Sequence, residues 1–163
     1  MKKMKQMSAI LLTVVMSLGL STTAFAAEPT TSNSGRTELA AYNQVLNENR
    51  DVLQGLISEN KTLMEKVKTT QKEMKESGTL TKEIAIELKN MSALIQNQRI
   101  SLTEKRDLVM ELHDNGRKSM EAGDIETAKI TLEQVIEIQL EQLELQNGLS
   151  NLLVQKLEML QNN

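Results

Sequence analysis

The feature that most constrains this chain is a regular repeat of apolar side chains that begins after residue 36 and is interrupted only twice. In its first long stretch, core positions follow one another after four and three residues in turn, at Leu39, Tyr42, Leu46, Asn49, Leu53, Leu56, Asn60, Leu63, Val67, Thr70 and Met74. A repeat of this kind, sustained over such a length, is typical of α-helices that pack as in coiled coils. We therefore expect long helices and no sheet.

Two short turn-forming segments divide the repeat, Ser77-Gly78-Thr79 and Gly123-Asp124. They predict three helices, at Thr37–Glu76, Leu80–Ala122 and Asp124–Gln161. Each turn glycine suits the left-handed conformation that follows a helix, while Thr79 or Thr81 and Asp124 can cap the helices that begin there. Short turns between helices of similar length make neighbours antiparallel. The predicted fold is all-α, an elongated antiparallel three-helix bundle over residues 37–163.

The N-terminus has the three parts of a secretory signal peptide. Lys2, Lys3 and Lys5 begin the chain, an apolar run covers residues 7–20, and a small-x-small triplet is formed by Ala24, Phe25 and Ala26. We expect cleavage between Ala26 and Ala27. The apolar run is shorter than the roughly 20 residues that span a bilayer, so a retained membrane anchor is the weaker alternative. The prediction is a signal peptide at 1–26, a flexible polar leader at 27–36, and a secreted protein of the cell envelope or the medium.

Composition excludes several classes of function. The chain has no cysteine and a single histidine, which excludes disulfides, zinc ribbons, iron–sulfur clusters and thiol nucleophiles. Aromatic residues make up only 1%, too few for a surface that stacks nucleic-acid bases. Loss of Lys2, Lys3 and Lys5 with the signal peptide would make the chain more acidic than its full-length net charge of -3. We therefore predict no nucleic-acid partner and no stable membrane insertion after cleavage.

Motifs for catalysis or cofactor binding are absent from the sequence. A di-iron bundle needs two Glu-x-x-His motifs, whereas the only histidine, His113, follows Glu111 at the wrong spacing. Asp114-Asn115-Gly116 lacks the alternating oxygen ligands of a calcium loop, and we expect a helix kink or local break there. No nucleophile elbow or phosphate-binding glycine loop occurs. The sequence predicts a protein that is not an enzyme, with no catalytic residue, cofactor or metal.

Three polar residues, Asn49, Asn60 and Gln98, occupy core positions of the repeat. One alternative is a ligand-binding layer inside the bundle. The other, more usual for such residues, is that they fix the register and the partner choice of the helices at some cost in stability.

The third helix carries an extra apolar row at Ile138, Leu145, Leu152 and Met159, beside its main apolar face. The row is either an association seam for a protein partner or a second copy, or the edge of the internal core. Because the segment from Asp124 onward is strongly acidic, an antiparallel dimer or a basic partner helix is favoured over parallel self-pairing.

Short motifs carry three resemblances. Gly116, Gly123, Asp124 and Ala128 have the spacing of one tetratricopeptide-type hairpin, which implies a tight pair of helices. The order of an Asn-rich first helix, Ser77-Gly78-Thr79 and Gly123-Asp124 resembles a group of secreted, coiled-coil-like helical proteins of Gram-positive bacteria, which implies export but no particular activity. Leu80-Thr81 and Leu102-Thr103 are similar to the paired Leu-Thr-x-x-Gln motifs of envelope-stress chaperones, with Ile84 and Arg106 in place of glutamine.

Together these observations predict a non-enzymatic, extracytoplasmic interaction or structural protein. The alternative is an envelope chaperone or stress-response binding protein, because amphipathic helices with several methionines suit adaptable binding of many clients.

Overall fold

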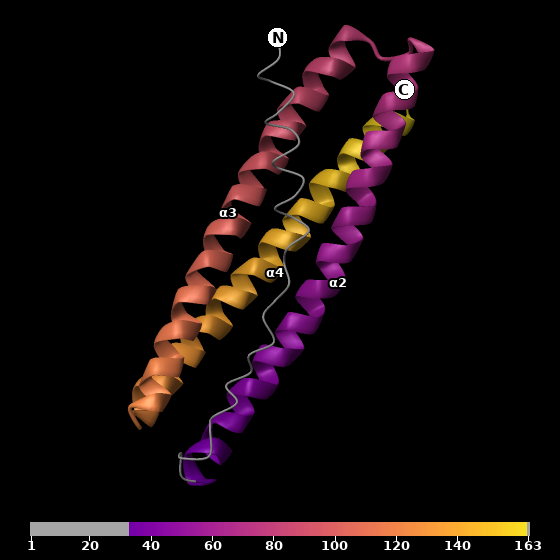
Figure 1. Ribbon diagram of the computed structural model, residues 1–163. Helices are drawn as coiled ribbons and strands as arrows, with labels where there is room; N and C mark the ends of the chain where they lie inside the picture. The colour runs from indigo at the N-terminus through magenta and orange to yellow at the C-terminus, as the bar shows by residue number, and fades with distance from the viewer. Residues whose placement is uncertain (1–32, 163) are drawn as a thin grey trace.

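The computed structural model describes residues 33–162, with side chains from residue 39 onward, and this part is all-helical. Its three helices are α2 (Asn33–Ser77), α3 (Lys82–Glu121) and α4 (Ile125–Gln161). They form the elongated bundle in Figure 1, in which α3 runs opposite to α2 and α4 returns in the direction of α2. The predicted all-α fold of three long helices is confirmed. The expected signal peptide and its cleavage residues Ala24, Ala26 and Ala27 lie outside the described residues.

The helix ends differ slightly from the predicted ones. α2 begins at Asn33, so residues 33–36 are helical, although they were expected in the polar leader. One glycine inside a helix, here Gly35, costs only about 1 kcal/mol relative to alanine and does not stop the helix. α3 begins at Lys82 because Thr81 is its N-cap, and the Thr81 side chain accepts a hydrogen bond from the Ile84 backbone N–H at 3.3 Å.

Both turns have the expected geometry. Gly78 and Gly123 adopt φ values of 73° and 77°, a region in which residues with a Cβ are strained. The Thr79 N–H donates to the Met74 carbonyl at 3.1 Å, which satisfies a backbone acceptor at the end of α2. Asp124 caps α4 and accepts from the Thr127 N–H at 3.0 Å. The two glycine turns therefore end α2 and α3 as the sequence predicts.

α4 is the central helix of the bundle. It packs against both α2 and α3, whereas no Cα atom in the described part of α2 lies within 8 Å of a Cα atom of α3. Figure 1 shows α4 behind and between the other two helices. α2 and α4, which are not consecutive, run parallel, and α3 runs antiparallel to both. α2 and α3 are consequently not in close backbone contact, although side chains of both contribute to the same core clusters.

The apolar core has two clusters, one toward each end of the bundle. The first includes Leu39, Leu46, Val109, Met120, Ala128, Leu132, Val135 and Ile138. The second includes Val67, Met74, Ile84, Leu88, Leu149, Leu153 and Leu160. α4 supplies the largest fully buried side chains, Leu132, Leu153 and Val135. This helix therefore holds the two outer helices in place.

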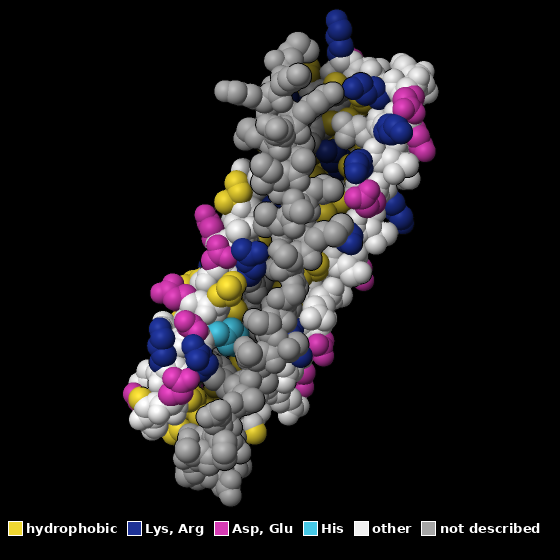
Figure 2. All heavy atoms as spheres, viewed as in Figure 1, with side chains coloured by type: hydrophobic (Ala, Val, Ile, Leu, Met, Phe, Trp, Pro, Cys, Tyr) yellow, Lys and Arg dark blue, Asp and Glu magenta, His cyan; other side chains and the backbone are white. Residues whose placement is uncertain are grey.

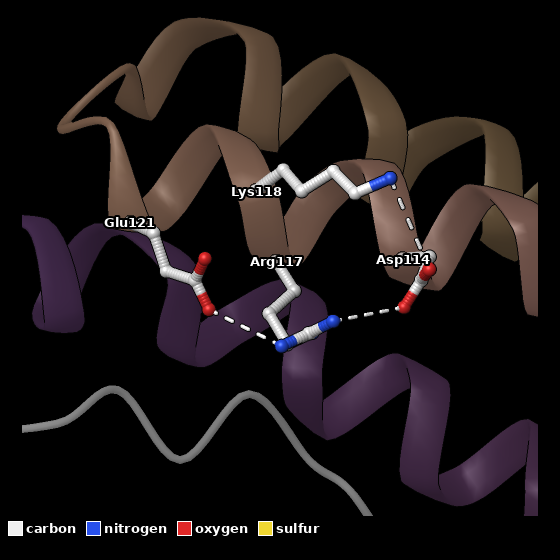
Figure 3. Close-up of polar contacts among 4 residues, drawn as sticks. All are labelled: Asp114, Arg117, Lys118 and Glu121. Atoms are coloured by element: carbon white, nitrogen blue, oxygen red, sulfur yellow. Dashed lines mark hydrogen bonds and ion pairs between the residues drawn. The ribbon is translucent and has the colours of Figure 1, made fainter.

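The expected kink at Asp114-Asn115-Gly116 is wrong, because α3 continues without a break through these residues. Gly116 is buried, and a side-chain network covers the exposed side of this turn (Figure 3). Arg117 pairs with Asp114 at 3.1 Å and with Glu121 at 3.3 Å, and Lys118 lies 4.0 Å from Asp114. Each such pair adds about 0.2–0.5 kcal/mol to a helix, which helps to offset the cost of the glycine.

Within residues 33–162, no helix is sufficiently long and apolar to span a bilayer.

Candidate interaction surface

In α2 the buried residues recur every seven positions and form its core row: Leu39, Leu46, Leu53, Asn60, Val67 and Met74. The rows on the two sides of this core row differ in burial. Residues seven apart lie on the same stripe of a packed helix. One stripe is exposed along its length, at Val45, Val52, Glu59, Lys66 and Glu73. The stripe on the other side of the core row is half-buried throughout, at Asn43, Arg50, Ile57, Met64 and Gln71. We call this second stripe the inner row of α2.

α3 shows the same asymmetry. One of its side rows is largely exposed, at Glu87, Leu94, Ser101, Leu108 and Asn115. The other, the inner row of α3, contains Ser92, Arg99, Arg106, His113 and Met120, of which the middle three are half-buried and Met120 is buried. Both outer helices therefore have one enclosed flank and one flank in solvent.

Contacts with α4 show which way these rows face. The Tyr42 hydroxyl donates to Glu133 at 2.9 Å, and Lys105 pairs with Glu141, both on the side of the exposed rows. Ser92, from the inner row of α3, accepts from the Lys156 ammonium at 2.7 Å. In both outer helices the inner row lies on the same rotational side of the core row. Because α3 runs antiparallel to α2, this places the two inner rows on the same side of the bundle, the side between α2 and α3. We call this side the α2–α3 face.

Charge on the α2–α3 face has a single sign. The inner rows contain Arg50, Arg99 and Arg106 and no acidic residue. The next row outward on each helix also lacks Asp and Glu, and these two rows contain Lys61, Lys68, Lys75, Lys82, Lys89 and Arg117. Figure 2 looks onto this side and shows Lys and Arg, with Asp and Glu among them, along both flanking helices. The chain is acidic overall, with a net charge of -3, yet it presents a basic face.

Only some of these cations are paired. Arg106 contacts Asp107 at 2.8 Å and Lys68 contacts Glu65 at 3.7 Å, in both cases with an acid that lies outside the face. Such exposed pairs contribute about 0–1 kcal/mol. Four lysines on the face have no ion pair within 4.0 Å among residues 39–162: Lys61, Lys75, Lys82 and Lys89. Their charges are available to an anionic partner.

Four buried polar side-chain atoms have no hydrogen-bond partner in the part of the chain that the structure describes. They are Asn49 Nδ2, Arg50 Nε, Asn60 Oδ1 and Gln139 Oε1. Asn60 is 2% exposed and Gln139 5% exposed. A buried polar group without a partner costs about 1–3 kcal/mol, so these atoms lower the stability of the fold.

Two of the three core polar residues identified in the sequence connect the helices at mid-length. The Asn60 amide donates to the Gln146 backbone carbonyl at 3.0 Å and to Gln146 Oε1 at 2.8 Å. The Gln98 amide donates to the Leu145 carbonyl at 3.2 Å. These bonds tie α2 and α3 to α4 at one level, which favours the register alternative over a ligand layer for these two residues. Asn49 makes no such bond through its unpartnered amide nitrogen.

Sequence reasoning missed the polar residues that α4 contributes. Gln139 and Gln146 are spaced by seven and continue the row of Leu132 and Leu153, while Lys156 belongs to the adjacent row with Leu149. All three are buried. Extending the heptad rows through the third helix would have found them, because each is a polar residue in a mostly apolar row.

The predicted association row lies at the edge of the monomer core. Ile138 is buried in the first core cluster, and Met159 packs against the second. Leu145 and Leu152 are half-buried. This placement favours the core-edge alternative, and self-association through these residues stays a prediction.

Burial also perturbs three cationic groups. It lowers the pKa of the Arg99 guanidinium, of the His113 imidazole and of the Lys156 ammonium, because desolvation disfavours the charged form. Within the described residues no group of three His, Asp or Glu side chains could hold a metal ion.

No family model, no curated protein and no solved structure matches this chain.

Proposed function

We propose that the protein is a non-enzymatic helical interaction protein that acts outside the cytoplasm and binds its partner on the α2–α3 face. The signal-peptide pattern of residues 1–26 supports the location. The observation that carries the binding surface is the separation of α2 from α3 together with the basic charge along both sides of the gap.

α4 gives this surface a rigid base. Its apolar side chains are buried against both outer helices, so the spacing of α2 and α3 is set by the core. The amides of Asn60 and Gln98 fix the register of the helices at mid-length. A preorganised surface of this kind reduces the entropy cost of binding.

Site-specific photo-crosslinking in cells that express the full chain tests this proposal. A photoreactive residue at Met64, on the inner row, is compared with one at Val52, which lies on the exposed row of the same helix and is 55% exposed. We expect a discrete adduct from position 64 and none from position 52. Adducts of equal intensity from both positions, or from neither, would contradict the proposed surface.

An envelope chaperone is the second candidate, and one observation favours it. Outside its inner row α3 carries three exposed apolar side chains, Ile86, Leu94 and Ile100. Exposed apolar side chains of this kind can bind unfolded clients. The test is the aggregation of an unfolded model protein at stoichiometric ratio. Suppression that is lost on replacing these three residues by serine would support the chaperone, and absence of suppression would exclude it.

Self-association through the row in α4 is tested by light scattering. If the row is a seam, the wild type is a dimer and the variant Leu145→Glu with Leu152→Glu is a monomer that keeps its helical circular dichroism. A wild type that is monomeric at high micromolar concentration would place these residues in the monomer core alone.

A further inference from the structure

We infer that the first part of α2, residues 39–53, is a strap that leaves the bundle while the rest of the protein stays folded. This motion lies beyond the proposed function, because it belongs to the monomer and needs no partner. Three features of the structure carry it: a polar waist between the two core clusters, the few side chains that hold the strap, and the way the helices are connected at each end of the bundle.

A polar waist separates the buried residues of the two core clusters along each helix. In α2 the first cluster ends at Leu46 and the second begins at Val67, and in α4 the corresponding residues are Ile138 and Leu149. Core positions between the clusters are polar in all three helices: Asn49, Asn60, Gln98, Lys105, Gln139 and Gln146. Since burial of apolar surface is what couples the parts of a fold, two clusters divided in this way can open separately.

The waist also contains the buried polar atoms that lack a partner. All four such atoms in the described part of the chain, in Asn49, Arg50, Asn60 and Gln139, lie between the two clusters. Asn49 Nδ2 and Arg50 Nε belong to the strap. A buried polar group without a partner destabilises the closed state, and it gains hydrogen bonds to water when its segment opens. Release of the strap therefore removes part of the cost of closing it.

Few buried side chains hold the strap. It contributes Leu39 and Leu46 to the first cluster, and Tyr42 packs against that cluster. The Tyr42 hydroxyl donates to Glu133 of α4 at 2.9 Å. Leu53, at the end of the strap, is buried but belongs to neither cluster. The strap is thus attached to the bundle mainly through the first cluster.

The part of α2 beyond the waist is held more firmly. Val67 and Met74 are buried in the second cluster, and Leu63 and Met64 pack against it. This part continues directly into the turn at Gly78, so it cannot leave the bundle without moving α3. The inner-row position Met64, chosen for crosslinking, therefore stays in the packed part of the helix.

The connections between the helices let the strap leave alone. No turn joins the strap to α3 or α4, and its end of the bundle is closed by the turn between those two helices (Figure 1). α3 and α4 pack against each other, so they remain as a helical hairpin when the strap is released. Gly55 follows the strap, and a Cβ there would have no atom within 4 Å. Because glycine is a weak helix former, α2 is easily interrupted at this point.

Release of the strap has two physical consequences. It uncovers the apolar side of the α3–α4 hairpin, where Leu132 is 1% and Val135 0% exposed in the closed state. An isolated helix of about 15 residues is marginal in water, so the released strap also loses its backbone hydrogen bonds. Opening is therefore detectable as exchange of amide hydrogens in the strap.

Native-state hydrogen exchange followed by mass spectrometry tests the strap on the protein purified from cells that express the full chain. Residues 39–53 are compared with residues 63–76, which belong to the same helix but lie beyond the waist. We expect the amides of the strap to exchange at least about tenfold faster, because they open without the second cluster. Equal exchange in the two segments would overturn the inference.

Matched core truncations show whether the strap opens alone. Leu46→Ala removes a contact of the first cluster, and should speed exchange of residues 39–53 about tenfold or more while residues 63–76 stay within about twofold of the wild type. Leu153→Ala is the matched control in the second cluster, and should speed exchange of residues 63–76 while the strap stays within about twofold. Equal acceleration of both segments by each variant would overturn the inference, because the bundle would then open as one unit.

A milder variant covers the case in which Leu46→Ala does not fold. Tyr42→Phe keeps the ring and removes only the hydroxyl that bonds Glu133. It should speed exchange of the strap by about threefold and leave residues 63–76 unchanged. The same acceleration in both segments, or none in the strap, would contradict a strap held at this contact.

Discussion

The cross-helix hydrogen bond of Gln98 can be tested by adding one methyl group to its neighbour on α4. A Cβ at Gly148 would lie 2.5 Å from Gln98 Nε2 and 3.6 Å from Gln98 Cδ. The amide must therefore move away, and its bond to the Leu145 carbonyl, 3.2 Å long, is lost. A hydrogen bond of this kind contributes about 1 kcal/mol net to stability. Alanine in place of a helical glycine contributes about 1 kcal/mol in the opposite direction.

The two terms should cancel, so Gly148→Ala is expected to change the free energy of unfolding by about 0 kcal/mol. Gly55→Ala is the matched control, because a Cβ at Gly55 in α2 has no other atom within 4 Å. That variant should gain the full helix-propensity term of about 1 kcal/mol. The measurement is urea unfolding followed by circular dichroism, with stability taken from the midpoint at a common slope.

A double-mutant cycle separates the two terms. In a Gln98→Ala background the clash and the hydrogen bond are both absent, so Gly148→Ala should stabilise by about 1 kcal/mol, as Gly55→Ala does in the wild type. If Gly148→Ala stabilises the wild type as much as Gly55→Ala does, the contact between Gln98 and α4 contributes nothing. The register role of Gln98 would then be refuted.

Three further outcomes follow from the described contacts. Gln146→Leu should destabilise by about 1–3 kcal/mol because it leaves the buried Asn60 amide without its side-chain partner, whereas adding Asn60→Leu should restore stability to at least the wild-type value in urea unfolding. Burial lowers the folded-state pKa of His113, so its stabilising effect is present above pH 6.5 and is lost as pH falls through the lower folded value. Urea midpoints at pH 7.5 and 5.0 should therefore differ less in a His113→Gln variant. Leu132→Ala should cost about 2–5 kcal/mol, and Leu140→Ala, at 50% exposed, less than about 1 kcal/mol; equal losses would contradict the central place of α4.

The heptad pattern and the two glycine turns were sufficient to predict the three helices, because both signals are local. A helix is specified by its own apolar row, by the residue that caps its start and by the residue that ends it. Thr81 and Asp124 cap α3 and α4, and Gly78 and Gly123 end α2 and α3. The failure at Asp114-Asn115-Gly116 is instructive. The motif contains residues typical of turns, yet the buried Gly116 and the ion pairs of Arg117 keep α3 continuous. Tertiary burial and neighbouring side chains decide whether such a motif breaks a helix.

The arrangement of the helices could not be predicted in the same way. The apolar rows of α2, α3 and α4 are compatible with three equally packed helices and with a central α4. Which arrangement forms depends on the packing energy summed over all the helix contacts, and the sequence of one helix does not determine that sum. The association row of α4 illustrates the difficulty. Ile138 and Leu145 continue past the main apolar face in sequence, but in the structure they lie within and beside the monomer core.

Charge shows most clearly what a sequence average conceals. The net charge of -3 argues against anionic partners, yet it is a sum over all sides of the bundle. The acidic residues of α2 and α3 lie outside the inner rows and the rows next to them, so one side is basic and the others carry the acid. The separation of acidic and basic residues follows the heptad positions, so it could be predicted from the sequence. Its meaning depends on knowing that Arg50 and Arg106 lie on the side where α2 and α3 are apart. A partner that meets the protein there encounters the local charge, at distances shorter than the Debye length of about 8 Å, and not the net charge of the chain.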